Sequence, residues 1–484
     1  MNVPGTSLAV PTDLYIGGRW RPASDGGRFE VFDPATERRL ASVASATPAD
    51  ALAAVASAHE AMVDWAARPP RERAEILRRA FDLFDERKAD FARLITLENG
   101  KASADALGEA NYAAEFFRWY AEGAVRNLGS LSTAPASRAR ILVQHRPAGV
   151  GVLVTPWNYP AAMGTRKIAP ALAAGCSVVI KPASETPLTM LALMPLLEEA
   201  GVPPGVVNVV PSRSAGTVVD TMLHDSRVRV VSFTGSTEVG RKILKTAADG
   251  IIKPAMELGG NAPVIVFEDA DIDEAVAGAL QAKMRNLGEA CTAANRFYVH
   301  EAVHEEFVEK FSAALDTLRL GNGLHEGVDV GPLVNAETRD KVMALVGDAL
   351  SKGAKLVRGG QVPEGPGFFY PPTVLTEVPE DAQMVGEEIF GPVAAIQRFS
   401  DQDEVIEKAN ATEYGLVAYV FTRDLKRGLQ VSEALEFGMV GLNRGLVSDP
   451  AAPFGGVKQS GLGREGAEEG MKEFLETQYV SVSW

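Results

Sequence analysis

The residue whose setting most strongly suggests chemistry is Cys291, one of only two cysteines in the 484-residue chain. It lies in the segment 284–296, MRNLGEACTAANR, among small and polar neighbours, whereas Cys176 lies in the apolar run AAGCSVVI. A cysteine acts as a nucleophile when its thiolate has partial access, nearby N–H donors or positive charge, and room for a substrate carbon. The pattern favours this role for Cys291, although a single cysteine in a polar loop is a weak signal.

Glu257 is the second residue that could do chemistry, because it stands between Met256 and Leu258 and before a double glycine. A carboxyl group in such apolar company is partly buried, which raises its pKa and suits it to general-base catalysis. The alternative is an ordinary glutamate in a turn before the strand expected at 263–266.

The segment from His300 to His304 matches the H-E-x-x-H pattern of zinc proteases. That chemistry requires both histidines on one face of one helix. Here RFYVH predicts a strand that ends near His300, with a helix beginning after it, so the two imidazoles are not expected to converge and we reject a metal site.

Composition excludes several classes of protein. A net charge of −15 without any dense run of lysine or arginine argues against nucleic-acid binding. Two cysteines argue against a disulfide framework and for a reducing compartment. The first residues lack a basic stretch followed by an apolar core, and no apolar run approaches the roughly 18 residues of a membrane span. We therefore expect a soluble, cytoplasmic protein, and its length suggests about three domains or two large ones.

The first third of the chain predicts strands and turns over 14–43 and then three helices. Thr47 followed by Pro48 opens the first helix, and apolar spacing of three to four residues predicts the others over 71–98 and 103–122. The following segment is rich in small residues and ends in a β-type run. It predicts an extended hairpin used for a subunit contact, with a plain surface loop as the alternative.

From residue 148 onward strands alternate with helices, which predicts a parallel sheet covered by helices. The strands are expected at 150–155, 176–181, 206–210 and 229–233, and the helices between them at 161–174 and 188–200. Ligands of such sheets bind beyond the carboxyl ends of the strands. Polar residues follow three of these strands: Trp157-Asn158, Lys181 with Ser184, and Gly235-Ser236. The last pair opens a helix and suits a pyrophosphate, although GSTEVG is not the G-x-G-x-x-G fingerprint.

Seven motifs together resemble the aldehyde dehydrogenase superfamily, in family order and over nearly the whole chain. They are TPWNYP (155–160), KPASETP (181–187), FTGSTEVG (233–240), MELGGNAP (256–263), GEACTAANR (288–296), EEIFGPV (387–393) and PFGGVKQSG (453–461). The wording of MRNLGEAC, LGREG and AAPFGG resembles the succinate-semialdehyde dehydrogenase branch.

The resemblance implies a three-part α/β fold: a Rossmann-like parallel-sheet domain, an α/β catalytic domain and a small β element for oligomerisation. The coenzyme-binding domain would comprise 1–122 and 146–255, the catalytic domain 256–445, and the oligomerisation element 123–145 with 467–484. The family forms dimers or tetramers, so a homodimer or homotetramer is expected.

The resemblance also implies a mechanism. Cys291 would attack an aldehyde carbon, with the Asn158 amide and the Cys291 backbone N–H stabilising the oxyanion. Glu257 would activate the water that hydrolyses the thioester. Lys167 and Glu476 would relay protons.

The coenzyme and substrate contacts follow in the same way. The residues expected to bind the coenzyme are Thr155, Trp157, Lys181, Ser184, Gly235, Ser236, Glu388 and Phe390. Ser184 replaces the glutamate of many NAD-using relatives, so we expect NADP to be preferred and NAD to be usable.

Arg166, Arg285 and Ser448 resemble a clamp for a substrate carboxylate, since the guanidinium fork matches that group. The alternative is that the two arginines form structural ion pairs.

We expect oxidation of succinate semialdehyde. The alternatives are another aldehyde, such as glutarate semialdehyde or an uncharged aliphatic one, and a coenzyme-independent Cys–Glu hydrolase. Ala293 stands where many members of the branch carry a second cysteine, so a disulfide switch is not expected.

Overall fold

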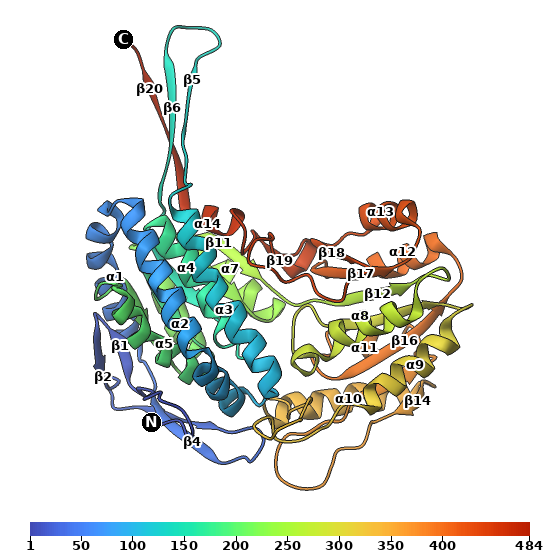
Figure 1. Cartoon of the computed structure of the whole chain (residues 1–484). Coiled ribbons are helices and arrows are strands. Elements are labelled where there is room, and N and C mark those ends of the chain that lie inside the picture. Colours follow the sequence, from blue (N-terminus) through green and yellow to red (C-terminus); the bar gives the residue numbers. More distant parts are fainter.

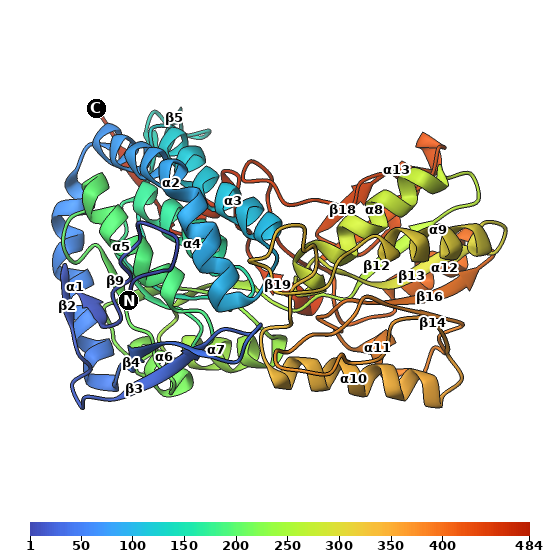
Figure 2. The same ribbon diagram turned by 60° about the horizontal axis from the view of Figure 1, so that its bottom comes forward.

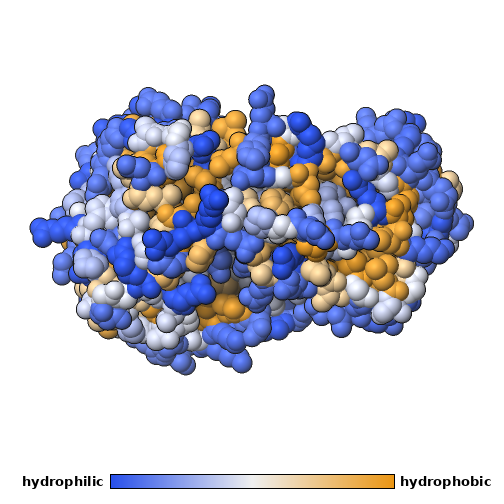
Figure 3. Space-filling view, turned by 90° about the horizontal axis from the view of Figure 1, so that it is seen from below, coloured by the Kyte–Doolittle hydropathy of each residue, from blue (hydrophilic) through white to orange (hydrophobic).

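The computed structural model describes residues 1–484 and consists of two α/β halves and a projecting arm, as Figure 1 shows. The first half is built on an eight-stranded sheet and the second half on a seven-stranded sheet. Figure 2 shows the two halves lying side by side after a rotation. Seen from below, on the side away from the arm, the surface is mainly hydrophilic with hydrophobic patches near its middle (Figure 3).

The first sheet has a parallel centre, from β11 to β9, with β19 and β1 antiparallel to their neighbours at its two sides. Its strands β7 and β8 are buried on both faces and consist of valine, leucine, isoleucine and glycine with one lysine, as is typical of central parallel strands. In order across the sheet the strands are β19 (Gly461–Leu462), β11 (Lys253–Glu257), β10 (Val228–Thr234), β7 (Val150–Val154), β8 (Val178–Lys181), β9 (Val207–Val209), β1 (Leu14–Ile16) and β2 (Arg19–Arg21).

Helices cover both faces of this sheet. Residues of α2 to α5 share one hydrophobic core, and residues of α1, α6 and α7 share the other. The helices are α1 (Pro48–Ala67), α2 (Pro70–Asn99), α3 (Ser103–Ala124), α4 (Ala162–Ala174), α5 (Leu188–Ala200), α6 (Ala215–Leu223) and α7 (Thr237–Asp249). A separate hairpin joins β3 (Arg28–Phe32) to β4 (Arg39–Ala44).

The predicted helix limits are confirmed to within two residues for α2 and α3. Thr47 caps α1 by accepting from the backbone N–H of Asp50, while the Asp50 carboxylate accepts from the backbone N–H of Thr47. Gly100 ends α2 in the left-handed conformation, which glycine adopts without steric cost.

The second sheet is parallel except for β14, which pairs antiparallel with β15. Its order is β14 (Lys355–Arg358), β15 (Thr373–Thr376), β16 (Val393–Phe399), β13 (Ala294–His300), β12 (Ala262–Val266), β17 (Val417–Phe421) and β18 (Met439–Leu442). The helices of this part and of the C-terminal segment are α8 (Ile272–Met284), the 3₁₀ turn η1 (Arg285–Gly288), α9 (His304–Asp316), α10 (Ala336–Ser351), α11 (Gln383–Gly386), α12 (Gln402–Asn410), α13 (Leu425–Ala434), η2 (Lys458–Ser460) and α14 (Glu469–Lys472).

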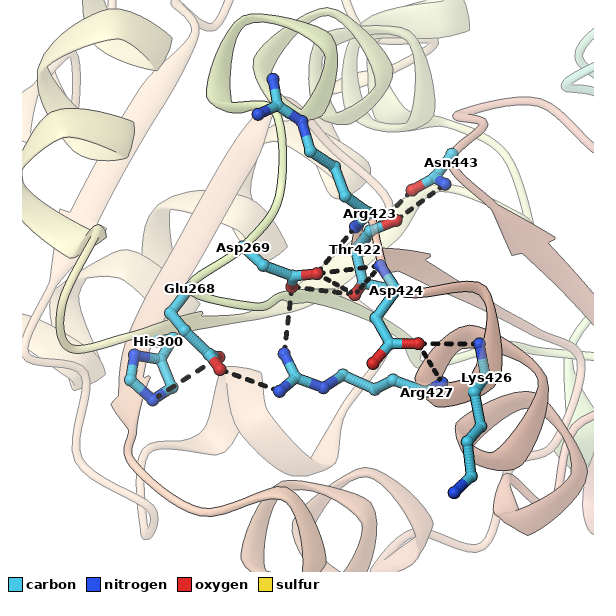
Figure 4. Close-up of polar contacts among 9 residues, drawn as sticks. All are labelled: Glu268, Asp269, His300, Thr422, Arg423, Asp424, Lys426, Arg427 and Asn443. Atoms are coloured by element: carbon cyan, nitrogen blue, oxygen red, sulfur yellow. Dashed lines mark hydrogen bonds and ion pairs between the residues drawn. The ribbon is translucent and has the colours of Figure 1, made fainter.

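A polar network ties the end of β12 to the start of α13 (Figure 4). The Asp269 carboxylate accepts from the Thr422 hydroxyl, from the backbone N–H groups of Arg423 and Asp424, and from the Arg427 guanidinium. These bonds pair donors at the start of a helix that would otherwise lack partners.

β13 ends at His300 and α9 begins at His304, which confirms the predicted change from strand to helix within H-E-x-x-H.

The arm is a three-stranded antiparallel sheet in the order β20-β6-β5, and it projects from the first half (Figure 1). The hairpin predicted near 123–145 is present as β5 (Ser130–Thr133) and β6 (Arg140–Pro147), and the C-terminal strand β20 (Leu475–Val482) pairs with β6. Large apolar side chains are exposed along it, namely Leu131, Leu142, Tyr479, Val480 and the following Trp484.

One of the predicted domain limits needs a correction. The limit between 255 and 256 cuts through β11, which pairs with β10 over its whole length and so belongs to the first sheet. β19 returns to the same sheet from the C-terminal segment. No helix combines the length and the apolar character that crossing a membrane requires.

Candidate active site

Ten of the residues singled out in the sequence line a cavity of about 380 Å³ between the two halves: Trp157, Asn158, Arg166, Gly235, Ser236, Arg285, Cys291, Glu388, Phe390 and Ser448. Thr155, Lys167, Lys181, Ser184, Glu257 and Glu476 do not line it. The chain crosses from one sheet to the other through a short connection between β11 and β12, so the carboxyl end of β11 faces the amino end of β12. Glu257 is the last residue of β11, and Cys291 precedes the neighbouring strand β13. The site is therefore built where two sheets meet, and each half supplies part of it.

Cys291 lines the cavity and is partly exposed, whereas Cys176 is buried. The turn before Cys291 contains three successive residues in the left-handed region, 286–288. Gly288 is required there, because a Cβ on it would lie 2.4 Å from the carbonyl oxygen of Gly391. Burial raises the pKa of the Cys291 thiol to about 12, even though Arg166 opposes the shift, so the resting thiol is protonated at neutral pH.

Two hydrogen-bond donors near Cys291 are suited to stabilising an oxyanion. The side-chain amide of Asn158 lines the cavity and donates one N–H to the backbone oxygen of Glu289 at 2.9 Å. Its second N–H remains for a substrate oxygen. The backbone N–H of Cys291 makes no hydrogen bond within the chain and is the other donor.

Glu257 is 2% exposed, and neither of its carboxyl oxygens has a hydrogen-bond partner. Burial, reinforced by the nearby Glu465 carboxylate, raises the pKa of Glu257 well above its usual value of 4.5. The prediction of a buried glutamate is confirmed, and the alternative of an ordinary turn residue is wrong. A raised pKa favours the protonated form of this carboxyl group and makes it a stronger base once it is ionised.

The expectation that Glu476 accompanies Lys167 is wrong. Glu476 lies on β20, where it is exposed and pairs across the arm with Arg146. The carboxylate beside Lys167 is Glu465, which accepts from the Lys167 ammonium and forms an ion pair with Arg166. Sequence reasoning missed Glu465 because the C-terminal segment contains several acids at similar spacing, and only the fold determines which one is buried.

The residues expected to hold a coenzyme lie at the carboxyl ends of the first sheet and on the facing loops. Ser236 caps α7 by accepting from the backbone N–H of Val239. Lys181 ends β8 and is 5% exposed, and burial lowers the pKa of its ammonium to about 8. Thr155 follows β7 and donates its backbone N–H to the carbonyl of Lys181. Ser184 donates to the Glu185 carboxylate at 3.2 Å.

The loops of the second half complete this region. Glu388 accepts from the backbone N–H of Gly260 at 3.1 Å, and burial raises its pKa to about 7. Trp157 and Phe390 pack edge to face with their ring centres 5.3 Å apart. The hydroxyl of Thr234 is buried, lines the cavity and has no partner in the chain. A helix start, a buried lysine and an unpaired hydroxyl together fit a phosphate-bearing nucleotide.

The two arginines of the expected clamp have different surroundings. Arg285 lies within 3.3 Å of the hydroxyls of Thr292 and Ser448 and has no carboxylate bound to it. Arg166 is paired with Glu465 and packs over the ring of Phe454 at 4.3 Å. Arg166 therefore forms the ion pair of the alternative, but it also lines the cavity and its Nη2 has no hydrogen-bond partner. Arg285 lines the cavity too, and it differs from Arg166 in having no carboxylate partner.

Comparison with known proteins agrees with this geometry. The aldehyde dehydrogenase family profile matches residues 20–480. The chain belongs to the aldehyde dehydrogenase family. It is 55% identical over 444 residues to the succinate-semialdehyde dehydrogenase of Paenarthrobacter nicotinovorans, covering 92% of this chain and 99% of that protein. It is 48% identical over 469 residues to the glutarate-semialdehyde dehydrogenase of Pseudomonas putida (strain KT2440), covering 97% of both.

The fold of this aldehyde dehydrogenase is likewise confirmed by comparison with solved structures. The crystal structure of an NADP-dependent enzyme of Escherichia coli is 47% identical, has a TM-score of 0.97 and covers 98% of each chain. The chain is therefore an NAD(P)-dependent oxidoreductase with the expected α/β architecture.

Glu289, two residues before the nucleophile, is a buried carboxyl group that the sequence analysis did not single out. One of its oxygens accepts from the backbone N–H of Val334 at 3.1 Å, and burial raises its pKa from 4.5 to about 8. Between these pH values the folded chain holds a proton that the unfolded chain releases, so stability falls as pH rises through this window.

Glu289→Gln keeps an oxygen for Val334 and removes the titration. We expect the melting temperature of the variant to exceed that of the wild type by more at pH 8.5 than at pH 5, as measured by thermal unfolding across this range. Glu476→Gln, at an exposed position, is the control and should follow the wild type. Parallel profiles for Glu289→Gln and wild type would contradict a titrating buried carboxyl group.

Proposed function

We propose that this aldehyde dehydrogenase oxidises succinate semialdehyde to succinate, with NADP as the preferred coenzyme. The observation that carries the substrate proposal is Arg285, which lines the cavity of the Cys291 thiol and has no carboxylate of its own. A carboxylate at the far end of a short aldehyde substrate would supply the missing partner of Arg285. Ser448, beside Arg285, adds a hydroxyl donor, and the relative from Paenarthrobacter nicotinovorans carries the matching name.

The chain's own residues account for the first chemical stage. The Cys291 sulfur adds to the aldehyde carbon, and its proton leaves to a base, the role that we assign to the ionised form of Glu257. The resulting oxyanion is stabilised by the Asn158 amide and the Cys291 backbone N–H. Lys181, Ser236 and Glu388 would hold a nicotinamide coenzyme, which would supply the hydride acceptor.

The second stage releases the acid. A thioester on Cys291 is attacked by water, and Glu257 takes the proton from that water as the C–S bond breaks. The proton then passes toward the buried pair of Lys167 and Glu465, which lies next to Glu257. Burial of Glu257 suits it to this task, since a raised pKa makes its carboxylate a stronger base.

The main alternative is glutarate semialdehyde, which is one methylene longer and carries the same carboxylate. The relative from Pseudomonas putida supports it, because the two chains are 48% identical over nearly their whole length. A hydrophobic pocket discriminates one methylene by only about 10–200-fold, so the two substrates differ in degree. A coenzyme-independent hydrolase is the weaker alternative, because it would not need the strand-end residues that suit a nucleotide.

We also propose a cytoplasmic homodimer or homotetramer. The apolar side chains on the arm would be covered by a second copy, and both cysteines are free thiols, which suits a reducing compartment.

Three substitutions separate the catalytic stages. Cys291→Ala should abolish aldehyde oxidation while coenzyme still binds. Glu257→Gln should give one burst of reduced coenzyme and little steady turnover, because thioester hydrolysis stalls. Asn158→Ala should slow oxidation by on the order of 10²–10³, the usual cost of one oxyanion donor. Stopped-flow absorbance of the reduced coenzyme measures all three, and wild-type turnover by Cys291→Ala would disprove the mechanism.

The arginines are distinguished by comparing succinate semialdehyde with butyraldehyde. Arg285→Ala should lower kcat/KM for the acid by about 10–150-fold, the value of a hydrogen bond to a charged group, and leave butyraldehyde nearly unchanged. Arg166→Ala should impair both aldehydes, because it leaves Glu465 less compensated. Arg285→Lys is the matched control: it keeps the charge, loses the fork, and should retain part of the preference. Equal losses on both aldehydes for Arg285→Ala would overturn the substrate proposal.

The coenzyme preference depends on Ser184. A glutamate there would accept from the ribose 2′-hydroxyl of NAD and repel the 2′-phosphate of NADP, whereas serine can donate to that phosphate beside Lys181. Ser184→Glu should therefore reverse the order of kcat/KM for the two coenzymes. Glu185→Gln is the control for the neighbouring carboxylate, and it should increase the ratio of kcat/KM for NADP to kcat/KM for NAD. A wild type that strongly prefers NAD, or an unchanged order in Ser184→Glu, would refute this assignment.

A further inference from the structure

We infer that Asn286 is a positioning residue: it holds the oxyanion-stabilising amide of Asn158 against the Cys291 loop, across the boundary between the two halves. Asn286 lies five residues before the nucleophile in sequence and does not line the cavity. The inference deepens the proposed function, because it rests on an oxyanion forming beside Cys291.

The contacts of Asn286 connect the two parts of the site directly. Its side-chain nitrogen Nδ2 donates to the backbone oxygen of Asn158 at 3.0 Å and to the backbone oxygen of Glu289 at 2.8 Å. The Nδ2 of Asn158 donates to the same Glu289 oxygen at 2.9 Å. Both asparagines thus share one carbonyl acceptor, and Asn286 in addition holds the main chain of Asn158.

The orientation of the Asn286 amide follows from its neighbours. Two carbonyl oxygens face the same end of the side chain, and only the NH₂ end can donate to both. The residue is 0% exposed, so replacing this donor would leave buried carbonyl oxygens without it. The effect of Asn286 therefore depends on its amide donor and not on the volume of its side chain.

The backbone at Asn286 is fixed as well. It is left-handed, with φ 52°, a conformation that asparagine tolerates better than most residues. Its own N–H donates at 2.9 Å to the carboxylate of Asp105, which lies in the first turn of α3 in the other half. Asp105 of the first half thus fixes the backbone of Asn286, and the Asn286 side chain in turn fixes the main chain of Asn158, which also belongs to the first half.

Lys101 and Glu109 also hold the main chain of Asn158, but they belong to the same half as Asn158. The alignment of Asn158 across the boundary therefore depends on Asn286. The buried ammonium of Lys101 donates to the Asn158 backbone oxygen at 2.8 Å and pairs with Glu109. Glu109 also accepts from the backbone N–H groups of Ala161 and Ala162. These bonds fix the loop after β7 within the first half, whereas Asn286 relates that loop to Cys291.

Oxyanion donors are effective only when they are held in place before the reaction. Removing Asn286 would leave the Asn158 amide present but less well aligned, so the rate of oxidation should fall while the coenzyme still binds. Residues that act through one another give non-additive effects, and a double-mutant cycle measures this.

The experiment compares Asn286→Gly in the wild-type and Asn158→Ala backgrounds. Glycine removes the side chain and keeps the left-handed backbone without strain. In the wild-type background we expect the burst rate and kcat/KM to fall by about 10-fold, less than the loss from deleting the donor itself. In the Asn158→Ala background the same substitution should cost less than about 2-fold, the limit of additivity between independent sites.

Asn443→Gly is the matched control. Asn443 is also left-handed, with φ 52°, and its side chain pairs with the backbone of Thr422, outside the cavity (Figure 4). It should lower the melting temperature without changing the burst rate. Asp105→Ala, which removes the hold on the Asn286 backbone, should act in the same background-dependent way and serves if Asn286→Gly does not fold.

The same rates are measured with both succinate semialdehyde and butyraldehyde, because the Asn286 effect should not depend on the acid group. If the substrate proposal fails, only the ratio of the rates measured with the two aldehydes changes, and the Asn286 effect remains. Equal losses from Asn286→Gly in the two backgrounds, or no loss in the wild-type background, would overturn the inference.

Discussion

The arrangement of this enzyme depends on burying ionisable groups at the junction of two sheets. A buried charge is costly unless it is paired, and an unpaired group becomes neutral instead. Glu465 is paired with both Arg166 and Lys167, and it remains charged. Glu257 and Cys291 form no such ion pairs, and burial raises the pKa of both groups, which favours their protonated forms. Burial thus favours the uncharged forms of both reactive groups, while Arg285 has hydroxyl partners and no carboxylate partner in the chain.

The same junction explains why two halves are needed. The first sheet presents the carboxyl ends of its strands, where helix N-termini and a buried lysine suit a nucleotide. The second half supplies the nucleophile before β13 and the loop that carries Glu388. Asn158 and Cys291 come from opposite sides, and their relative position is determined by hydrogen bonds between main-chain and asparagine groups. A small rotation between the halves would separate the donor from the sulfur without unfolding either half.

Much of the fold and the reacting groups could be predicted from sequence, because they depend on local patterns. Alternating apolar segments predicted the parallel sheet, and the helices α2 and α3 end where a glycine or a change in composition indicates. Cys291, Asn158 and Glu257 lie in motifs whose neighbours are distinctive. Glu465 could not be distinguished from Glu476 by spacing, since burial depends on how the C-terminal segment packs. The pairing of Arg166 and the bridging role of Asn286 involve partners far away in the sequence, for which no local pattern exists.

The measurement that tests this account most directly is the rate at which iodoacetamide alkylates Cys291 in the free enzyme as a function of pH. Because Cys176 is fully buried, Cys176→Ala can serve as the background to confirm that one thiol reacts. We expect slow alkylation at neutral pH and a rate that still rises above pH 9, since burial raises the pKa of the thiol and favours its protonated form. A rate that reaches a plateau near pH 7 would show a stable resting thiolate and would contradict the proposal that burial keeps the nucleophile neutral.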